Sequence, residues 1–164
     1  CIQIAEEEIL LGKDDIILVN SGRSHALKSE KENVIVIMHV RSELILELAQ
    51  SPYTIFMCKR HATELYQLDD EFCSKYMQEM VKVAKAVSRA FDCEKMNYEC
   101  LGNGDTHIHW HLFPRVSGDL GEYGNNGKGP VWWLPKEIMW DKSNIPNEYK
   151  LEEMKGKLLQ ELNI

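Results

Sequence analysis

The chain has 164 residues, a formal net charge of −7 and an apolar fraction of 44%. This length fits one globular domain over residues 1–164, with its core at about 33–140 and a C-terminal extension at 141–164. The negative charge, with Lys and Arg scattered, argues against binding to nucleic-acid backbones. No apolar run reaches the roughly 20 residues that cross a membrane, so we expect no membrane partner.

The chain has five cysteines, none of them spaced as C-x-x-C: Cys1, Cys58, Cys73, Cys93 and Cys100. An odd number without metal-ligand spacing is typical of free thiols in a reducing compartment. The first ten residues lack the basic segment and apolar core of a signal peptide. We therefore expect a cytoplasmic protein that holds no structural metal.

β-branched runs at 16–20, 33–40 and 53–58 predict three strands. Segment 41–50 fits either a helical turn or a strand. From about Asp70 to Phe91, apolar residues recur at every third or fourth position, which predicts a long amphipathic helix. The apolar stripe of this helix comprises Cys73, Met77, Met80, Ala84, Val87 and Phe91.

Two further β-runs, 96–101 and 106–114, flank the turn-like sequence 102–105 and predict a hairpin. The Gly- and Asn-rich segment 117–130 predicts a mobile loop, and 151–162 predicts a last amphipathic helix. The paired tryptophans between them are interpreted as packing residues. Together the elements predict one α+β domain with a mostly antiparallel sheet.

Three histidines occupy every second position of the last predicted strand: His107, His109 and His111. Because successive side chains of a strand point to opposite faces, the three imidazoles share one face. The intervening apolar side chains share the other face and can pack on the helix. Burying three unpartnered imidazoles would be costly, so we expect them to face water or a ligand.

This histidine face allows three interpretations. It is an exposed polar surface, a metal site, or a site of nucleophilic catalysis. Neighbouring same-face positions lie about 6.5–7 Å apart, so three in a row spread over roughly 13 Å and converge poorly on one metal ion. Imidazole is a nucleophile near neutral pH, and the adjacent Gly-rich turn can present backbone N–H groups to a phosphate. The sequence therefore favours nucleophilic catalysis.

The stretch 107–113 resembles the histidine-triad (HIT) family, because it matches the pattern His-φ-His-φ-His-φ-φ in full. KRHATELYQLD at 59–69 resembles the segment that follows a strand in that family. NYECLGN and PVWW resemble a bacterial-type branch related to diadenosine polyphosphate hydrolases. The resemblance implies a HIT-like fold: an antiparallel sheet of about five strands, a long central helix and a C-terminal helix.

The resemblance also implies roles for the three histidines. His109 is implied to be the nucleophile that attacks the α-phosphorus of a nucleotide. His107 is implied to hold the hydrogen-bond geometry around it, and His111 to contact the phosphate and assist the leaving group. Many members carry a fourth histidine where this chain has Tyr53. His61 is expected to be structural, with a hydrogen bond at a helix start.

Four further positions are expected to bind the substrate. Asn103 matches a position where the family carries an amide over the phosphates, and Asn97 is a second candidate. Gly104 belongs to the turn that can cradle the phosphate. Glu47 is the candidate for the acidic residue that holds the ribose hydroxyls.

The sequence thus predicts a nucleotide hydrolase or transferase that forms a nucleotidyl-His109 intermediate. Its expected substrates are dinucleoside polyphosphates or nucleoside phosphoramidates, with a purine nucleotide as partner, no cofactor, and a homodimer as the assembly. Two alternatives stay open: a nucleotide-binding regulatory module with a vestigial triad, and a metal-dependent hydrolase that uses the HxHxH histidines.

Overall fold

The computed structural model of the chain describes residues 2–4, 7–9, 16–20, 25–27, 35–40, 53–58, 60–104, 106–123, 127, 129–139 and 146–162. Within these residues the main sheet has five strands in the order β3-β5-β6-β8-β7. Their bounds are β3 Ile16–Asn20, β5 Ile35–Val40, β6 Thr54–Met57, β7 Lys95–Glu99 and β8 His109–Arg115. Three of the neighbouring pairs are antiparallel, and β3 runs parallel to β5. The predicted fold, a mostly antiparallel five-stranded sheet, is confirmed.

A second, three-stranded sheet has the order β2-β1-β4 and is antiparallel throughout. Its strands are β1 Ile2–Ile4, β2 Glu7–Ile9 and β4 His25–Leu27. The sequence did not predict this sheet, because three residues are too few to show a period of two. Segment 41–50, the remaining ambiguous element, lies outside the described residues.

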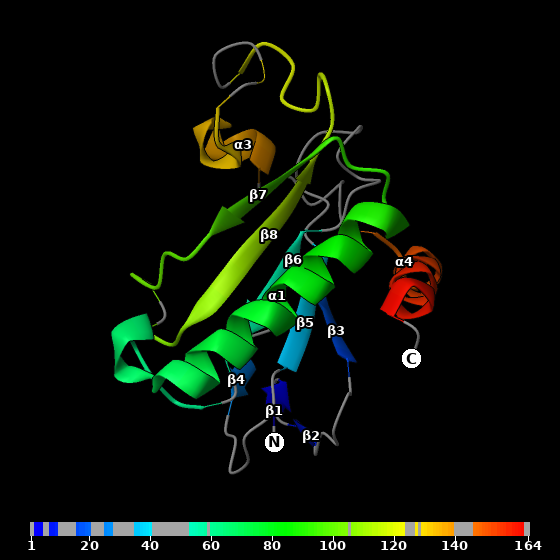
Figure 1. Ribbon diagram of the computed structural model, residues 1–164. Helices are drawn as coiled ribbons and strands as arrows, with labels where there is room; N and C mark the ends of the chain where they lie inside the picture. The colour runs from blue at the N-terminus through cyan, green and yellow to red at the C-terminus, as the bar shows by residue number, and fades with distance from the viewer. Residues whose placement is uncertain are drawn as a thin grey trace.

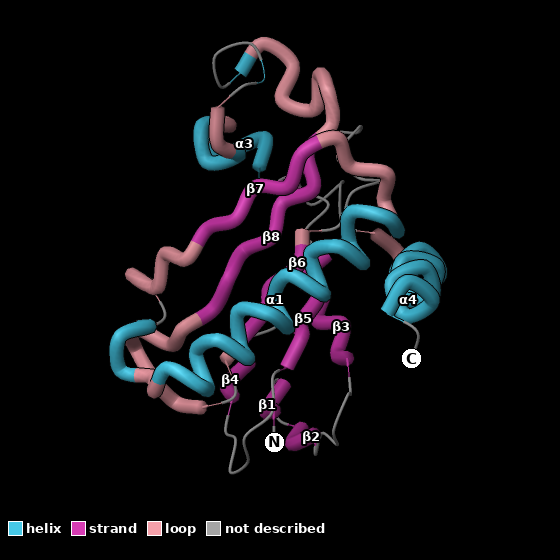
Figure 2. Tube along the Cα trace, viewed as in Figure 1, coloured by secondary structure: helices cyan, strands magenta, loops and turns pink. Residues whose placement is uncertain are grey.

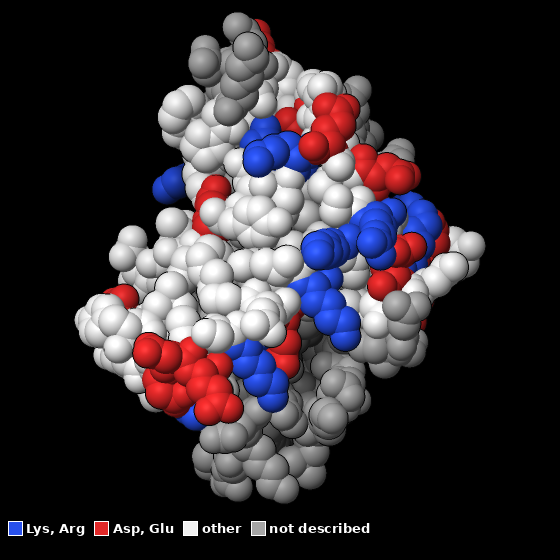
Figure 3. Space-filling view, in the orientation of Figure 1, with Lys and Arg blue, Asp and Glu red and all other residues white. Residues whose placement is uncertain are grey.

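The long helix α1, Asp70–Ala90, crosses one face of the main sheet, and the C-terminal helix α4, Glu148–Leu162, packs beside it (Figures 1 and 2). The predicted helix is confirmed to within one residue. The side chain of Asp69 accepts a hydrogen bond from the Phe72 N–H at 2.9 Å and caps the helix start. Acidic side chains gather near the start of α1 and basic ones farther along towards α4 (Figure 3), which suits the helix dipole.

The main core lies between α1 and the sheet. It combines Phe56 from β6, Leu112 from β8 and Ile108 just before β8 with Tyr76 and Val87 from α1. Side chains from α4 complete it, and they are Met154, Leu158 and Leu162. Removal of this apolar surface from water fixes which face of β8 is turned to the helix. No helix within the described residues is long and apolar enough to cross a membrane.

A smaller core lies on the opposite face of the sheet. It contains Tyr53, Phe113, Leu120, Val131 and Leu134. Val131 belongs to the 3-10 helix η3, Val131–Trp133. Leu134 follows that helix directly, before the short helix α3, Lys136–Met139. Because Leu120 is fully buried, the prediction of a mobile loop is wrong for the described part of 117–130.

The predicted hairpin is confirmed as an antiparallel β7–β8 pair, but its connection is longer than predicted. β7 ends at Glu99 and β8 begins at His109, so the connection spans 100–108 rather than 102–105. Residue Gly102 has φ 66°, a left-handed conformation that glycine adopts without strain. The chain leaves the β7–β8 ladder early and forms one wall of the site described next.

Candidate functional site

The alternation predicted for the histidine stretch is present. Ile108 and Leu112 are buried on the α1 side. His109 is 8% exposed and lies on the other face. The backbone of Ile108 is held on both sides, because its N–H donates to the Ala62 carbonyl at 2.9 Å and its carbonyl accepts from the Cys58 N–H at 3.0 Å. Backbone hydrogen bonds therefore hold the histidine stretch in place at the residue that precedes β8.

His109 has a defined proton position. Its Nδ1 lies 2.6 Å from the backbone carbonyl oxygen of His107. A carbonyl oxygen only accepts hydrogen bonds, so Nδ1 carries the hydrogen and donates it. In the neutral ring the lone pair is then on Nε2. The backbone thus orients His109 with Nε2 as its basic and nucleophilic nitrogen.

His107 is also anchored by a hydrogen bond to a backbone carbonyl. Its Nε2 donates to the backbone carbonyl of Cys58 at the end of β6. Its Nδ1 faces Nδ1 of His61 at 3.4 Å, and the two rings are stacked with centroids 5.6 Å apart. His61 was expected at a helix start, and its ring instead lies against His107. This arrangement ties the histidine stretch to the segment after β6.

His111 lies in an aromatic environment. Its Nδ1 is hydrogen-bonded to the Tyr53 hydroxyl, and the two rings are stacked at 5.5 Å with an interplanar angle of 8°. The His109 ring meets it edge-on at 4.7 Å. Burial, and then the neighbouring His109, lower the pKa of His111 to about 4. His111 is therefore neutral at pH 7.

This lowered pKa predicts a pH dependence of stability. The unfolded chain binds a proton at this imidazole near pH 6.5, whereas the folded chain does so only near pH 4. Keeping His111 neutral in the folded chain therefore contributes fully to the free energy of unfolding above pH 6.5. This contribution is lost as the pH falls towards 4, with a slope of at most about 1.4 kcal/mol per pH unit. Urea denaturation at pH 7.0, 6.0 and 5.0 should show this loss, and His111→Gln should reduce it. Parallel pH profiles for both proteins would contradict the assignment.

Trp132 extends the aromatic group around His111. Its ring meets His111 at 6.0 Å and Phe113 at 5.5 Å, both edge-on at 89°. Its indole N–H donates to the carboxylate of Glu99, which pairs with His111 across β7 and β8. Trp132 therefore packs as predicted on one side although it stays 40% exposed, whereas Trp133, which was also predicted to pack, is 59% exposed. The sequence missed Glu99, because the predicted turn at 102–105 would pair His111 with Met96, whereas the longer connection shifts the register by three residues.

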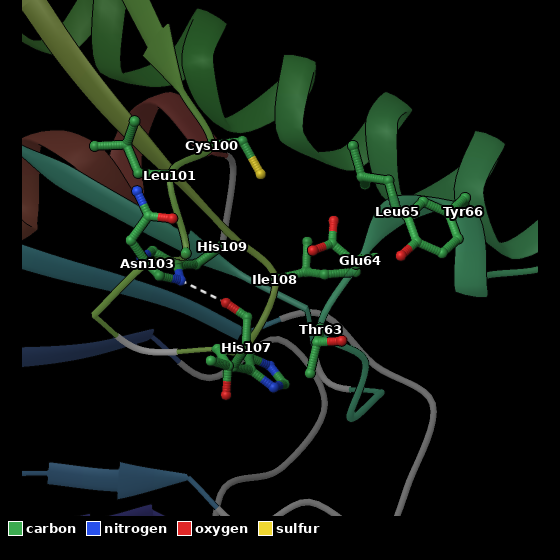
Figure 4. Close-up of a pocket in the computed structure, with 12 residues that line it drawn as sticks. Thr63, Glu64, Leu65, Tyr66, Cys100, Leu101, Asn103, His107, Ile108 and His109 are labelled. Carbon is green, nitrogen blue, oxygen red and sulfur yellow. Dashed lines mark hydrogen bonds between the residues drawn. The ribbon is translucent and has the colours of Figure 1, made fainter.

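A pocket of about 640 Å³ opens beside His109 (Figure 4). Its walls are the segments 63–66, 100–103 and 106–109. The first of these leads into the 3-10 helix η2, Leu65–Gln67. Figure 4 shows Asn103 beside His109 on one side of the space and Glu64 with Leu65 on the other. A ligand in this pocket would touch the histidine that carries the free lone pair.

The remaining predicted substrate-binding residues are placed differently. Asn103 lines the pocket, and its neighbour Gly104 is exposed outside the lining. Asn97 lies on β7 opposite Phe113, away from the pocket lining. Glu47 lies outside the described residues. Across the part of the chain that is described, no three His, Cys, Asp or Glu side chains are grouped as metal ligands.

Comparison with known proteins places the chain in a family. Residues 28–118, more than half of the chain, match the family model of the HIT domain, so the chain belongs to the HIT family. Protein hit of Bacillus subtilis (strain 168) is 28% identical over 100 residues. That match covers 57% of this chain and 64% of the relative, so the chain spans less than two thirds of that relative's length.

Solved structures share the fold. A histidine triad (HIT) protein from Sinorhizobium meliloti 1021 superposes with a TM-score of 0.56 at 24% identity, over 68% of this chain and 76% of that one. A histidine triad protein from Bradyrhizobium japonicum gives a TM-score of 0.62 at 20% identity, over 82% and 87%. At these identities the likeness establishes the HIT fold.

Proposed function

We propose that the chain is a nucleotide hydrolase or nucleotidyl transferase that cleaves at the α-phosphate of a nucleoside phosphate. The observation that carries this proposal is the orientation of His109. Its Nδ1 donates to the His107 carbonyl, and the ring lines a pocket large enough for a phosphate and its substituent. Membership in the HIT family supports a nucleotide as the ligand.

In the proposed reaction, Nε2 of His109 attacks the α-phosphorus, and the bond to the leaving group breaks. The leaving group takes the electron pair of that bond and a proton from a solvent water molecule, which becomes hydroxide. A second water molecule then attacks the phosphorus of the nucleotidyl-His109 intermediate, the P–N bond breaks with its electron pair returning to Nε2, and the nucleoside monophosphate is released. The proton lost by the attacking water neutralises the hydroxide.

The neighbours of His109 are assigned supporting roles. Asn103 and the backbone N–H groups around Gly102 bind the phosphate oxygens. We assign Tyr53 the position that the family's fourth histidine takes. When the Tyr53 hydroxyl donates to Nδ1 of His111, Nε2 of that ring carries the hydrogen and can donate to the phosphate or the leaving group.

The proposal is tested by product analysis. The purified chain is incubated with an adenosine phosphoramidate and with diadenosine tetraphosphate, and chromatography measures AMP release. With a slow phosphoramidate, mass spectrometry at high pH should detect a nucleotidyl adduct, and peptide mapping should place it within 107–111. AMP binding without turnover of either substrate would favour the regulatory-module alternative. An adduct on another residue would refute the mechanism.

We also propose that the chain forms a homodimer and binds a purine nucleotide. Large apolar side chains stay exposed on both faces of the sheet near its β7 edge: Tyr98 pairs with Leu112 on the α1 face, Trp132 contacts His111 on the other face, and Leu101 and Trp133 are exposed as well. Soluble monomers rarely leave extended apolar surface in water. A second copy with two-fold symmetry is the simplest cover for them.

A further inference from the structure

The carboxylate of Glu99 reaches the histidine face from the edge strand of the sheet. Glu99 ends β7 and pairs with His111 on β8, so the two side chains lie on the same face. Directly paired residues hold their Cβ atoms about 4.5–5.5 Å apart, which is close enough for a carboxylate to contact an imidazole. The Glu99 carboxylate accepts the indole N–H of Trp132 instead.

Trp132 closes one side of the space around His111. Its ring stands perpendicular to the His111 ring, with the two centroids 6.0 Å apart. From the other side, which is that of β6, the Tyr53 hydroxyl binds Nδ1 of His111 and the Tyr53 ring stacks on the imidazole. The imidazole is therefore held between the tyrosine and the indole.

The hydrogen bond to Glu99 determines how firmly Trp132 is held. Trp132 belongs to the three-residue 3-10 helix η3 and is 40% exposed. Packing on one side leaves an indole free to change its side-chain torsions, whereas a hydrogen bond to a carboxylate is directional and stronger than one between neutral groups. Glu99 therefore fixes the orientation of the ring that covers His111.

We propose that Glu99 and Trp132 are a pair of positioning residues for His111. Glu99 holds the indole in place, and the indole keeps water away from His111 and occupies the Glu99 carboxylate. His111 then stays oriented as a neutral hydrogen-bond donor towards the phosphate or the leaving group. This inference rests on the proposed function, in which His111 has that role.

The protonation of His111 reports on this arrangement. Burial is the main cause that lowers the pKa of His111 to about 4, and the neighbouring His109 adds to it. The titratable groups that face His111 within the described residues are His109, the Tyr53 hydroxyl and the Glu99 carboxylate. Loss of the indole cover would hydrate His111 and raise its pKa, whereas loss of a direct interaction with the Glu99 charge would lower it. The direction of the shift thus separates positioning by Glu99 from a direct charge effect.

The first measurement is an NMR titration of the imidazole nitrogens, with the His111 signals assigned from their loss in His111→Gln. Glu99→Ala and Trp132→Ala should both move the pKa of His111 upwards from about 4 towards 6.5. Glu99→Gln should leave it nearly unchanged, because the amide oxygen still accepts the indole N–H. The matched control is Glu94→Ala, since Glu94 precedes β7 and accepts from the Ser117 hydroxyl at 2.6 Å. This control should leave the titration of His111 unchanged.

The second measurement is single-turnover kinetics with an adenosine phosphoramidate. Glu99→Ala and Trp132→Ala should each lower the rate by about tenfold, less than the loss of His111 itself, and AMP affinity should stay nearly constant. Glu99→Gln should recover most of the rate. The double variant Glu99→Ala, Trp132→Ala should be no slower than either single variant, because the two residues act as one unit.

The outcomes separate this proposal from the proposed function. An unchanged or lower pKa of His111 in both alanine variants overturns the positioning role, and so does an equal loss of rate in Glu99→Ala and Glu99→Gln. No turnover of any substrate by the wild-type chain overturns the proposed function, while the NMR titration still decides whether Glu99 and Trp132 shield His111. If Trp132→Ala does not fold, Trp132→Phe replaces it. That variant keeps an aromatic ring without the N–H and should shift the pKa of His111 in the same direction.

Discussion

His109→Ala should lower turnover by several orders of magnitude while leaving nucleotide binding largely intact. The substitution removes the nitrogen that attacks phosphorus, and no other imidazole takes its place. His107 uses Nε2 on the Cys58 carbonyl, and His111 uses Nδ1 on Tyr53. Single-turnover kinetics with an adenosine phosphoramidate measure the rate, and titration calorimetry with AMP measures binding.

The two flanking histidines serve as matched controls for this prediction. His107→Ala and His111→Ala should each lower the rate by about 10²–10³-fold, the typical effect of one lost orienting or charge-stabilising group. His107→Ala keeps the backbone carbonyl that orients His109, so it should lower the rate less than His109→Ala does. Near wild-type turnover in His109→Ala would show that the nucleophile is another group.

Arg115→Ala should destabilise the fold by about 3–5 kcal/mol, because it leaves a buried carboxylate without its partner. Asp119 is 1% exposed, and its Oδ1 accepts from Nη2 of Arg115 at 2.8 Å. Nε of Arg115 donates to the other carboxylate oxygen. The same guanidinium donates to the carbonyls of Gly129 at 2.9 Å and Gly127 at 3.0 Å. These bonds close the segment that covers the smaller core.

Three variants test whether burial of the charge is the cause. Arg115→Lys should recover little of the loss, because an ammonium cannot form the forked pair. The double variant Arg115→Met, Asp119→Leu should cost less than either single removal. Lys157→Ala removes an exposed partner of Glu153 at 2.9 Å and should cost less than about 1 kcal/mol. Urea denaturation at pH 7 measures all of them, and equal losses for Arg115→Ala and Lys157→Ala would refute the argument.

Local patterns in the sequence were sufficient for the parts of the fold that depend on periodicity. The spacing of Met80, Ala84 and Val87 predicted α1, because a helical period of 3.6 residues places them on one face. The alternation from 107 to 112 predicted which side chains of the histidine stretch face the core and which face the site. The HIT fold and the histidine face followed from these patterns and from the family motif.

Tertiary structure alone decided which distant residues complete the site. Tyr53 reaches His111 across 58 positions because β6 and β8 are neighbours in a particular register. Glu64 shares a pocket with His109 because the segment after β6 and the 100–108 connection end at the same edge of the sheet. Arg115 and Asp119 are buried together because the segment after β8 folds back over the smaller core. Periodicity reports which face a residue occupies, whereas strand register and loop path decide what it meets there.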